Sequence, residues 1–373
     1  MRIGIPKETI REEKRVALAP SGIEALVNAG HSVFIETEAG LASHFSDEEY
    51  RDVGANIVYN AEEVYQRAEL LAKVAPISKS EIELLQEGQI VFSFLHLAVA
   101  EKEMLESLLK KKITAISYEL IEKSGQLPAL WSMSEIAGQL AIQVGERYME
   151  SDFSAGRGML MGGITGVAPA AVVIIGAGNV GLNCARAAYA RGAQVIVLDR
   201  DITKLRKVEE LVSKNITTVV ANPLTIARGV KFADLLIGAV HLHMERSPHV
   251  VTEEMVKSMK KGAVIIDISI DQGGCIETSY PTSISDPVFV KHDVIHYCVP
   301  NIATLVSRTA SFGLTNASVE FIQYIADNGL ENSLMNNAGL ANGVLTYNGH
   351  CSNEVIAETF NLEYRRLHIF SHN

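Results

Sequence analysis

Arg15 and His96 have side chains of the types that bind a carboxylate and transfer a proton. Arg15 follows the apolar N-terminal run, and a guanidinium can hold a carboxylate through two parallel hydrogen bonds. The alternative is a solvated surface arginine that pairs with Glu12 or Glu13. His96 closes the apolar stretch 90–95, and histidine is a residue type suited to general acid–base chemistry at a carbinol or an imine. The alternative is a core histidine that is hydrogen-bonded to the backbone.

Asp271 and Asn301 are two further polar residues at the ends of apolar runs. Asp271 is closely followed by Gly273 and Gly274, and such glycines allow a backbone to approach a ligand. The alternative for Asp271 is a tight turn with an Asx cap. The alternative for Asn301, which follows Pro300, is a turn residue without a ligand. At the carboxyl ends of neighbouring parallel strands, Asp271 and Asn301 could face the same crevice.

Residues 171–199 have the pattern of a dinucleotide site. An apolar run at 171–175 leads into Gly176, Gly178 and Gly181, which have the spacing G-x-G-x-x-G. In such a site these glycines permit, in order, the tight turn, the approach of the pyrophosphate and close helix packing. We expect a helix over 183–191 whose N-terminal end faces the phosphates.

A second apolar run ends at Asp199, 18 residues after Gly181. A carboxylate there can accept hydrogen bonds from both ribose hydroxyls and repels the 2′-phosphate of NADP, so the sequence predicts NAD as the cofactor. The alternative is a βαβ unit whose glycines serve packing only.

The elements that must position these residues alternate between strand-like and helical patterns, which predicts an α/β protein with parallel sheets. The strand-like runs form two blocks, at 3–6, 32–36, 70–74, 90–94 and 114–117, and then at 171–176, 194–199, 234–240 and 263–267. After about residue 305 the pattern is helical, and a helix leaving the second block there could return to the first. We also expect an Asn-Gly turn at 348–349.

The composition narrows the class of protein further. The chain has 373 residues, of which 47% are hydrophobic and 21% charged, as in an ordinary globular enzyme. Its net charge of −11 is a poor match for nucleic acid or an anionic membrane surface. No apolar run reaches the roughly 18 residues of a membrane span. The four cysteines are scattered, which favours a reduced, cytoplasmic protein without a zinc site.

His241, His243 and Glu245 alternate along the sequence, a spacing that places metal-ligating side chains on one face of a strand. No fourth ligand is apparent, so we interpret this segment as a solvated loop and expect no metal.

Taken together, the motifs resemble those of the alanine dehydrogenase family, which includes NAD-dependent alanine dehydrogenase and the N-terminal part of pyridine nucleotide transhydrogenase. The resemblance spans nearly the whole chain. It rests on segments in one order, at 1–8, 15–18, 30–31, 94–98, 133–138, 176–181, 233–240, 271–275 and 347–350.

The resemblance implies two Rossmann-like domains with parallel sheets and a cleft between them. It implies a discontinuous substrate domain (1–128 and 306–373), an NAD-binding domain (129–305) and a homohexamer. The implied activity is the reversible, NAD-dependent oxidative deamination of L-alanine to pyruvate and ammonia. Arg15 and Asn301 would bind the substrate, and His96 and Asp271 would act in catalysis. Cofactor contacts are implied at Ser134, Gly176, Gly178, Asn179, Val180, Gly181, Asp199, Lys204 and Val240.

One position departs from the family pattern at a residue with a chemical role. The family usually reads K-V-K-E-P before the histidine, and its second lysine holds the substrate. An ungapped alignment to His96 places Ala75 there. Loss of an ammonium from a closed site costs about 2–4 kcal/mol of transition-state stabilisation. Lys73, which has the same strand parity, or Lys79 nearby could compensate. Two alternatives follow: a dehydrogenase of another small 2-oxo or imino acid, and a catalytically impaired NAD-binding homologue.

Overall fold

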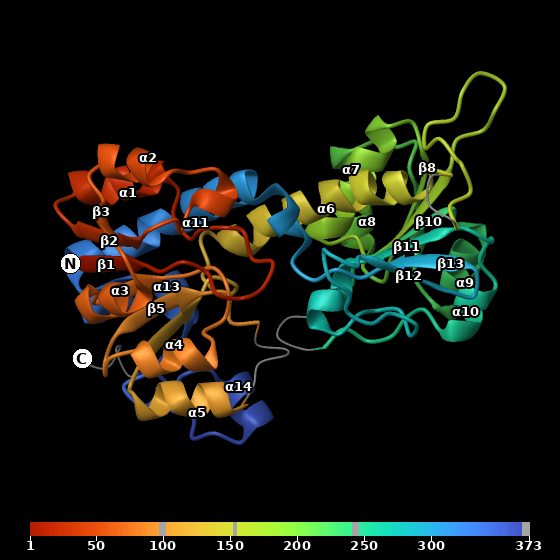
Figure 1. Cartoon of the computed structure of the whole chain (residues 1–373). Coiled ribbons are helices and arrows are strands. Elements are labelled where there is room, and N and C mark those ends of the chain that lie inside the picture. Colours follow the sequence, from red (N-terminus) through yellow and green to blue (C-terminus); the bar gives the residue numbers. More distant parts are fainter. Residues whose placement is uncertain (97–101, 152–154, 241–245, 368–373) are drawn as a thin grey trace. The chain divides into compact units, whose positions relative to one another are not determined.

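The chain divides into two compact units, which Figure 1 shows in a computed structural model. The structure describes residues 1–96, 102–151, 155–240 and 246–367. The first unit contains Met1–Met133 and Thr304–Asn373, and the second contains Ser134–Ala303. The red and orange N-terminal elements therefore share a unit with the blue C-terminal elements, while green and cyan elements form the other unit.

The first unit is built on an eight-stranded sheet. Its strands lie side by side in the order β15 (His350–Cys351), β14 (Val344–Tyr347), β6 (Thr114–Ser117), β5 (Ile90–Ser93), β4 (Leu70–Ala72), β1 (Arg2–Ile5), β2 (Ser32–Glu36) and β3 (Asn56–Val58). The strands from β6 to β3 are parallel, and the two C-terminal strands are antiparallel. Its helices are α1 (Pro20–Asn28), α2 (Asp47–Asp52), α3 (Ala61–Arg67), α4 (Lys79–Leu84), α5 (Lys102–Lys110), α11 (Ser307–Asn328), α12 (Leu330–Asn336), α13 (Ala338–Asn342) and α14 (Glu354–Phe360).

The second unit is built on a seven-stranded sheet. Its order is β12 (Val288–Lys291), β13 (Val294–Tyr297), β11 (Val264–Asp267), β10 (Leu235–Gly238), β7 (Ala171–Ile175), β8 (Gln194–Asp199) and β9 (Thr217–Val220), and only β12 is antiparallel. Its helices are α7 (Asn179–Ala190), α8 (Ile202–Leu211), α9 (Pro223–Phe232) and α10 (Glu253–Lys257). Helix α6 (Pro128–Tyr148) runs from the first unit into the second.

Both sheets share one strand order. Numbered within each unit, the parallel strands lie as 3-2-1-4-5-6, which reverses direction between the first and fourth strand. In such sheets ligands bind outside the carboxyl ends of the strands at this reversal. The reversal falls between β1 and β4 in the first unit and between β7 and β10 in the second. The predicted α/β class with two mostly parallel sheets is confirmed.

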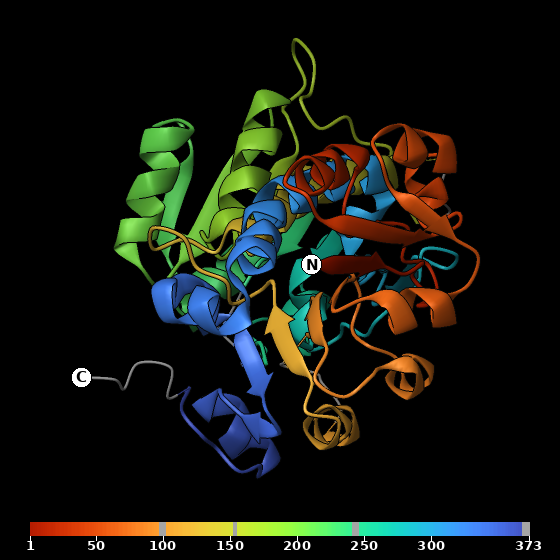
Figure 2. The same cartoon turned by 90° about the vertical axis from the view of Figure 1, so that its left-hand side faces the viewer.

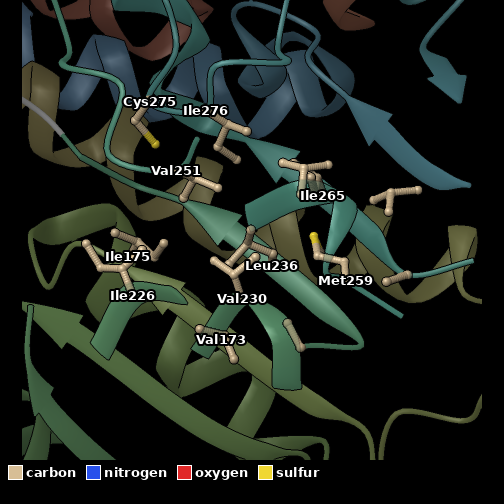
Figure 3. Close-up of a cluster of buried hydrophobic side chains, with 14 of the residues drawn as sticks. Val173, Ile175, Ile226, Val230, Leu236, Val251, Met259, Ile265, Cys275 and Ile276 are labelled. Carbon is tan, nitrogen blue, oxygen red and sulfur yellow. The ribbon is translucent and has the colours of Figure 1, made fainter. Parts of the chain in front are cut away.

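The central strands of the second unit are buried, as in parallel sheets whose two faces are covered by helices. All residues of β7, β10 and β11 are buried. Figure 3 shows one face of this core, where Val173, Ile265 and Leu236 of the sheet pack with Ile226 and Val230 of α9. This packing holds the strand ends in place.

The C-terminal segment completes the first sheet. The blue strand β14 pairs antiparallel with β6 (Figure 2), although more than 200 residues separate them in sequence. The predicted turn is confirmed: Asn348 and Gly349 have φ of +46° and +83° and connect β14 to β15. Two consecutive positive φ angles are typical of the tight turn that Asn-Gly favours.

Among the described residues, no helix combines the length and apolar character needed to cross a lipid bilayer.

Candidate functional site

Arg15 lies in the loop between β1 and α1, after the carboxyl end of β1. Only 3% of its side chain is exposed, and its Nε and Nη2 donate to the two carboxylate oxygens of Glu13 at 2.8 and 2.6 Å. Its Nη1 lies 3.3 Å from Sδ of Met133, and its guanidinium lies 5.8 Å from the centre of the Phe94 ring. Burial opposes ionisation of Glu13, but the hydrogen bonds and charge of Arg15 outweigh it, so the pKa of Glu13 is lowered. The alternative of a solvated arginine is wrong, although the pairing with Glu13 is observed.

The C-terminal segment holds the backbone around Arg15. The N–H of Lys14 donates to the Thr304 hydroxyl at 3.0 Å, and the N–H of Val16 donates to the Ser311 hydroxyl of α11, also at 3.0 Å. The discontinuity of the first unit therefore has a local consequence, because residues far along the chain fix this loop.

His96 follows β5 and has a φ of +46°, a conformation that few residues with side chains adopt. Glu119, which follows β6, stabilises this turn. Its Oε2 accepts hydrogen bonds from the N–H groups of Leu95 and His96 at 3.2 and 3.1 Å, and its Oε1 lies 3.5 Å from Nδ1 of His96. The imidazole is 22% exposed and stacks on the Phe94 ring. A half-buried imidazole facing a carboxylate is suited to proton transfer.

Lys73 lies just after β4 and is fully buried between two carboxylates. Its Nζ lies 2.8 Å from Glu8 and 3.1 Å from Glu81. Burial lowers the pKa of Lys73, but the two carboxylates outweigh this effect and raise it, so its ammonium stays charged. Lys79 is exposed and lies 3.3 Å from Glu103. Lys73 is thus committed to an internal ion pair, while the Ala75 methyl group is itself buried.

The glycine-rich loop of the second unit shows which glycines serve packing. Gly176 has a φ of +105°, and a Cβ there would lie 2.2 Å from the carbonyl oxygen of Ala239. A Cβ on Gly181 would lie 1.8 Å from the carbonyl oxygen of Gly176. Either clash excludes a side chain, so the protein's own backbone accounts for both glycines.

Gly178 differs from these two. It is the N-cap residue of α7 with φ −70° and ψ −168°, which any residue can adopt, and no described atom lies within 4 Å of where its Cβ would be. Packing therefore does not require glycine here. Open space at a helix N-terminus is what the approach of a pyrophosphate requires, so this loop fits a dinucleotide.

The helix after the loop starts earlier than predicted. Helix α7 begins at Asn179 rather than at residue 183, so Asn179, Val180 and Gly181 form its first turn. Their free N–H groups face the end of the helix where an anion binds.

Asp199 lies at the end of β8 beside the glycine-rich loop. One of its oxygens accepts a hydrogen bond from the N–H of Ala177 at 2.6 Å, and the other accepts one from the N–H of Asp201 at 2.8 Å. Each carboxylate oxygen has a further lone pair with which to accept a ribose hydroxyl. Lys204 is exposed on α8, the next helix.

Val240 and Ser134 are placed around the same loop. Val240 follows β10, next to the Ala239 carbonyl that contacts Gly176, and its own carbonyl accepts from the Ser247 hydroxyl at 3.0 Å. Ser134 lies on α6, four residues before Gly138, whose Cα packs on Val180 of α7. Residues four apart share a helix face, so Ser134 lies on the side of α6 that meets α7.

Asp271 and Asn301 are brought together in the second unit. Asp271 lies on the short helix η3 (Ile268–Gln272) after β11, and its Oδ1 accepts a hydrogen bond from the N–H of Asn301 at 2.8 Å. Asn301 has a φ of +52°, which asparagine tolerates better than most residues. The N-cap of η3 is Asp267, and Asp271 lies within η3.

Asp267 is buried and supports this turn. It accepts hydrogen bonds from the N–H groups of Ser269 and Cys275 at 3.1 Å each. Burial raises its pKa to about 6, against the opposing effect of hydrogen bonds from the side chain of Ser279 and the backbone of Cys275 and Ile276.

Sequence reasoning missed Glu119 and Asp267 and considered Glu13 only as a surface partner. Glu119 follows a buried strand, as His96 does, so the signal that found His96 applied equally to Glu119. Among the described residues, no three potential ligands are placed to hold a metal ion. His241, His243 and Glu245 lie outside the described residues.

The two Rossmann-like units, with a glycine-rich loop opening α7, define a nucleotide-binding α/β protein. Two family models match the chain: "Alanine dehydrogenase/PNT, N-terminal domain" over residues 4–137 and "Alanine dehydrogenase/PNT, C-terminal domain" over residues 141–354. The chain belongs to the alanine dehydrogenase/PNT family.

Named relatives match over nearly their whole length. The alanine dehydrogenase of Methanococcus maripaludis is 45% identical over 98% of both chains, and that of Staphylococcus epidermidis is 42% identical over 98% of this chain and 99% of its own. A solved L-alanine dehydrogenase is 39% identical with a TM-score of 0.91, covering 97% of this chain and 99% of its own. A transhydrogenase from Sinorhizobium meliloti shares the fold, with a TM-score of 0.80 at 23% identity over 95% of this chain and all of its own.

Proposed function

We propose that this protein oxidises L-alanine to pyruvate and ammonia with NAD as the hydride acceptor, and that it catalyses the reverse reaction as well. The observation that carries the proposal is Gly178, which leaves the N-terminus of α7 open in a chain that belongs to the alanine dehydrogenase/PNT family. Asp199 beside the loop supports NAD rather than NADP, because its carboxylate repels a 2′-phosphate.

Arg15 and His96 perform the substrate chemistry of the first unit. Glu13 pairs with Nε and Nη2 of Arg15, and the guanidinium of Arg15 binds the substrate carboxylate. Bound NAD supplies the acceptor for the hydride that leaves Cα of alanine. Loss of this hydride and one ammonium proton leaves an iminium ion, to which water adds to form a carbinolamine. His96 accepts a proton from that water and returns it to the amino group as the C–N bond breaks. His96 then takes the carbinol hydroxyl proton as the carbonyl of pyruvate forms.

The second unit binds the cofactor and completes the chemistry. The N–H groups of Asn179 and Val180 bind the pyrophosphate. The open space at Gly178 lets the pyrophosphate approach these groups. Ser134, Lys204 and Val240 contact the cofactor at the periphery of this site. Asp271, held by the N–H of Asn301, assists the addition of water and the release of ammonia.

The assignment of roles to domains follows the same proposal. Residues 1–128 and 306–373 form the substrate domain, and residues 129–305 form the NAD-binding domain. We also propose that the protein is a cytoplasmic homohexamer. Light scattering on the purified protein tests its oligomeric state.

The direct test is NADH formation from L-alanine and NAD at alkaline pH, followed by absorbance. We expect turnover with L-alanine, and in the reverse direction with pyruvate, ammonia and NADH. A folded protein that produces no NADH would refute the proposal.

Ala75 favours a second candidate, a dehydrogenase of another small 2-oxo or imino acid. The pairing of Lys73 with Glu8 and Glu81 supports this candidate, because Lys73 is then not free to replace the family lysine at Ala75. A panel of 2-oxo acids with ammonia and NADH separates the two functions. The Ala75→Lys variant adds a second comparison: a large gain with alanine identifies an impaired alanine enzyme, and a loss of turnover with another acid identifies an adapted pocket.

A further inference from the structure

A carboxylate of the protein itself lies where the strand order of the first unit reverses, between β1 and β4. Glu8 follows β1, and its side chain is only 5% exposed. One oxygen accepts a hydrogen bond from the N–H of Val74 at 2.6 Å, and the other accepts from Nζ of Lys73 at 2.8 Å and lies 3.3 Å from the N of Ala75. At the matching place in the second unit, the backbone opens at Gly178. Glu8 therefore binds the backbone N–H groups after β4, much as a ligand anion would.

The turn that Glu8 holds is connected to the proposed catalytic groups. The carbonyl of Val74 accepts a hydrogen bond from the N–H of Phe94 at 2.9 Å. The Phe94 ring in turn stacks on His96, with ring centres 6.3 Å apart, and lies under Arg15 at 5.8 Å. A chain of direct contacts thus runs from Glu8 through Val74 and Phe94 to both side chains.

We propose that Glu8 is a positioning residue: its carboxylate fixes the turn at Val74–Ala75, and through Phe94 it sets the places of Arg15 and His96. The inference rests on the proposed function. Glu8 thus affects the rate of the reaction without touching the substrate.

Glu81 provides a matched control. It is buried like Glu8 and pairs with the same Lys73, at 3.1 Å, but its other oxygen accepts from Ser78 at the start of α4. Either Glu8→Gln or Glu81→Gln leaves Lys73 with one carboxylate, so both variants are expected to fold. Only Glu8→Gln removes the charge that holds the Val74–Ala75 turn.

The experiment measures kcat, KM and NAD affinity for wild type, Glu8→Gln and Glu81→Gln, and adds Glu8→Ala with and without formate. We expect Glu8→Gln to lower kcat for alanine about 10- to 100-fold, because small misplacements of reacting groups cost this much. We expect Glu81→Gln to stay within about threefold of wild type, NAD affinity to stay unchanged in both, and formate to restore part of the kcat of Glu8→Ala. Equal losses in both glutamine variants, or no loss in Glu8→Gln, overturns the inference.

Hydrogen exchange of the Val74 and Ala75 amides separates this inference from the proposed function. We expect faster exchange at these amides in Glu8→Gln but not in Glu81→Gln, whatever the substrate is. If wild type does not oxidise alanine, the proposed function fails while this exchange result still decides the role of Glu8. Unchanged exchange in Glu8→Gln refutes the positioning role.

Discussion

Replacing Gly178 with alanine separates cofactor binding from folding at the start of α7. The backbone angles at Gly178 suit alanine, and no described atom lies within 4 Å of the new Cβ. A Gly→Ala change at a compatible position stabilises by about 0.4–1 kcal/mol through the unfolded chain. Alanine is a poorer N-cap than glycine by roughly a similar amount. The net change in stability is therefore within about 1 kcal/mol.

The effect on NAD binding is expected to be larger. The new methyl group occupies the open space through which, in the proposed function, the pyrophosphate approaches the N–H groups of α7. A hydrogen bond to a charged group contributes about 1.5–3 kcal/mol, and 1.4 kcal/mol is a factor of ten in affinity. Losing one such bond weakens NAD binding about 10- to 100-fold.

The assay combines calorimetric titration of NAD with thermal unfolding, and Gly181→Ala is the control. Its Cβ would lie 1.8 Å from the carbonyl oxygen of Gly176, so this variant is expected to lose more than about 2 kcal/mol of stability. If Gly178→Ala binds NAD within twofold of wild type at an unchanged Tm, the glycine is not a point of phosphate approach and the reasoning fails.

Three further predictions concern the buried groups. Lys73→Met leaves the carboxylates of Glu8 and Glu81 buried without a cation, and we expect it to lower the free energy of unfolding in urea by about 3–5 kcal/mol. The control Lys79→Met removes an exposed ammonium and should cost under about 0.5 kcal/mol. Similar losses in the two variants would contradict the ion-pair assignment. His96→Asn introduces a residue that tolerates the φ of +46° at this position. We expect it to lower kcat about 10²- to 10⁴-fold and to leave NAD affinity unchanged. Activity near that of wild type would exclude His96 as the acid–base. Asp267 has its pKa raised by burial to about 6 from an ordinary 3.8, so its contribution to stability is complete below about pH 4 and is lost as the pH rises through about 6. This amounts to roughly 3 kcal/mol at 1.36 kcal/mol per pKa unit, and Asp267→Asn should remove that part of the pH dependence of the urea midpoint; an identical pH dependence in the variant would rule out the titration.

The sequence was most informative where a pattern has one physical meaning. Alternating apolar runs predicted the parallel sheets, and Asn348-Gly349 predicted a tight turn, because few other sequences allow two positive φ angles. The start of α7 was predicted at residue 183. The structure begins α7 at Asn179 and places Gly181 in its first turn, where a Cβ would meet the carbonyl oxygen of Gly176.

The candidate site was predicted in part because parallel strands deliver their last residues to one edge. That rule placed His96 and Asp271 after β5 and β11, where they are found. It could not show that Glu119 faces His96 or that Asn301 donates to Asp271, since these pairs join separate strands through three-dimensional register. Nor could it show that Lys73 is held by Glu8, because strand parity gives the side of a residue and not its partner.

The buried cations explain why several carboxylates lie at these strand ends. Arg15 is buried, and a buried charge is costly unless it is paired and hydrogen-bonded, so Glu13 is required beside it. Lys73 requires Glu8 for the same reason, and Glu119 holds the strained backbone of His96. These carboxylates cancel the positive charge of the strand ends that they organise. In the proposed function, the anionic substrate is therefore recognised by directed hydrogen bonds from Arg15, and a positive potential over the whole unit is not needed.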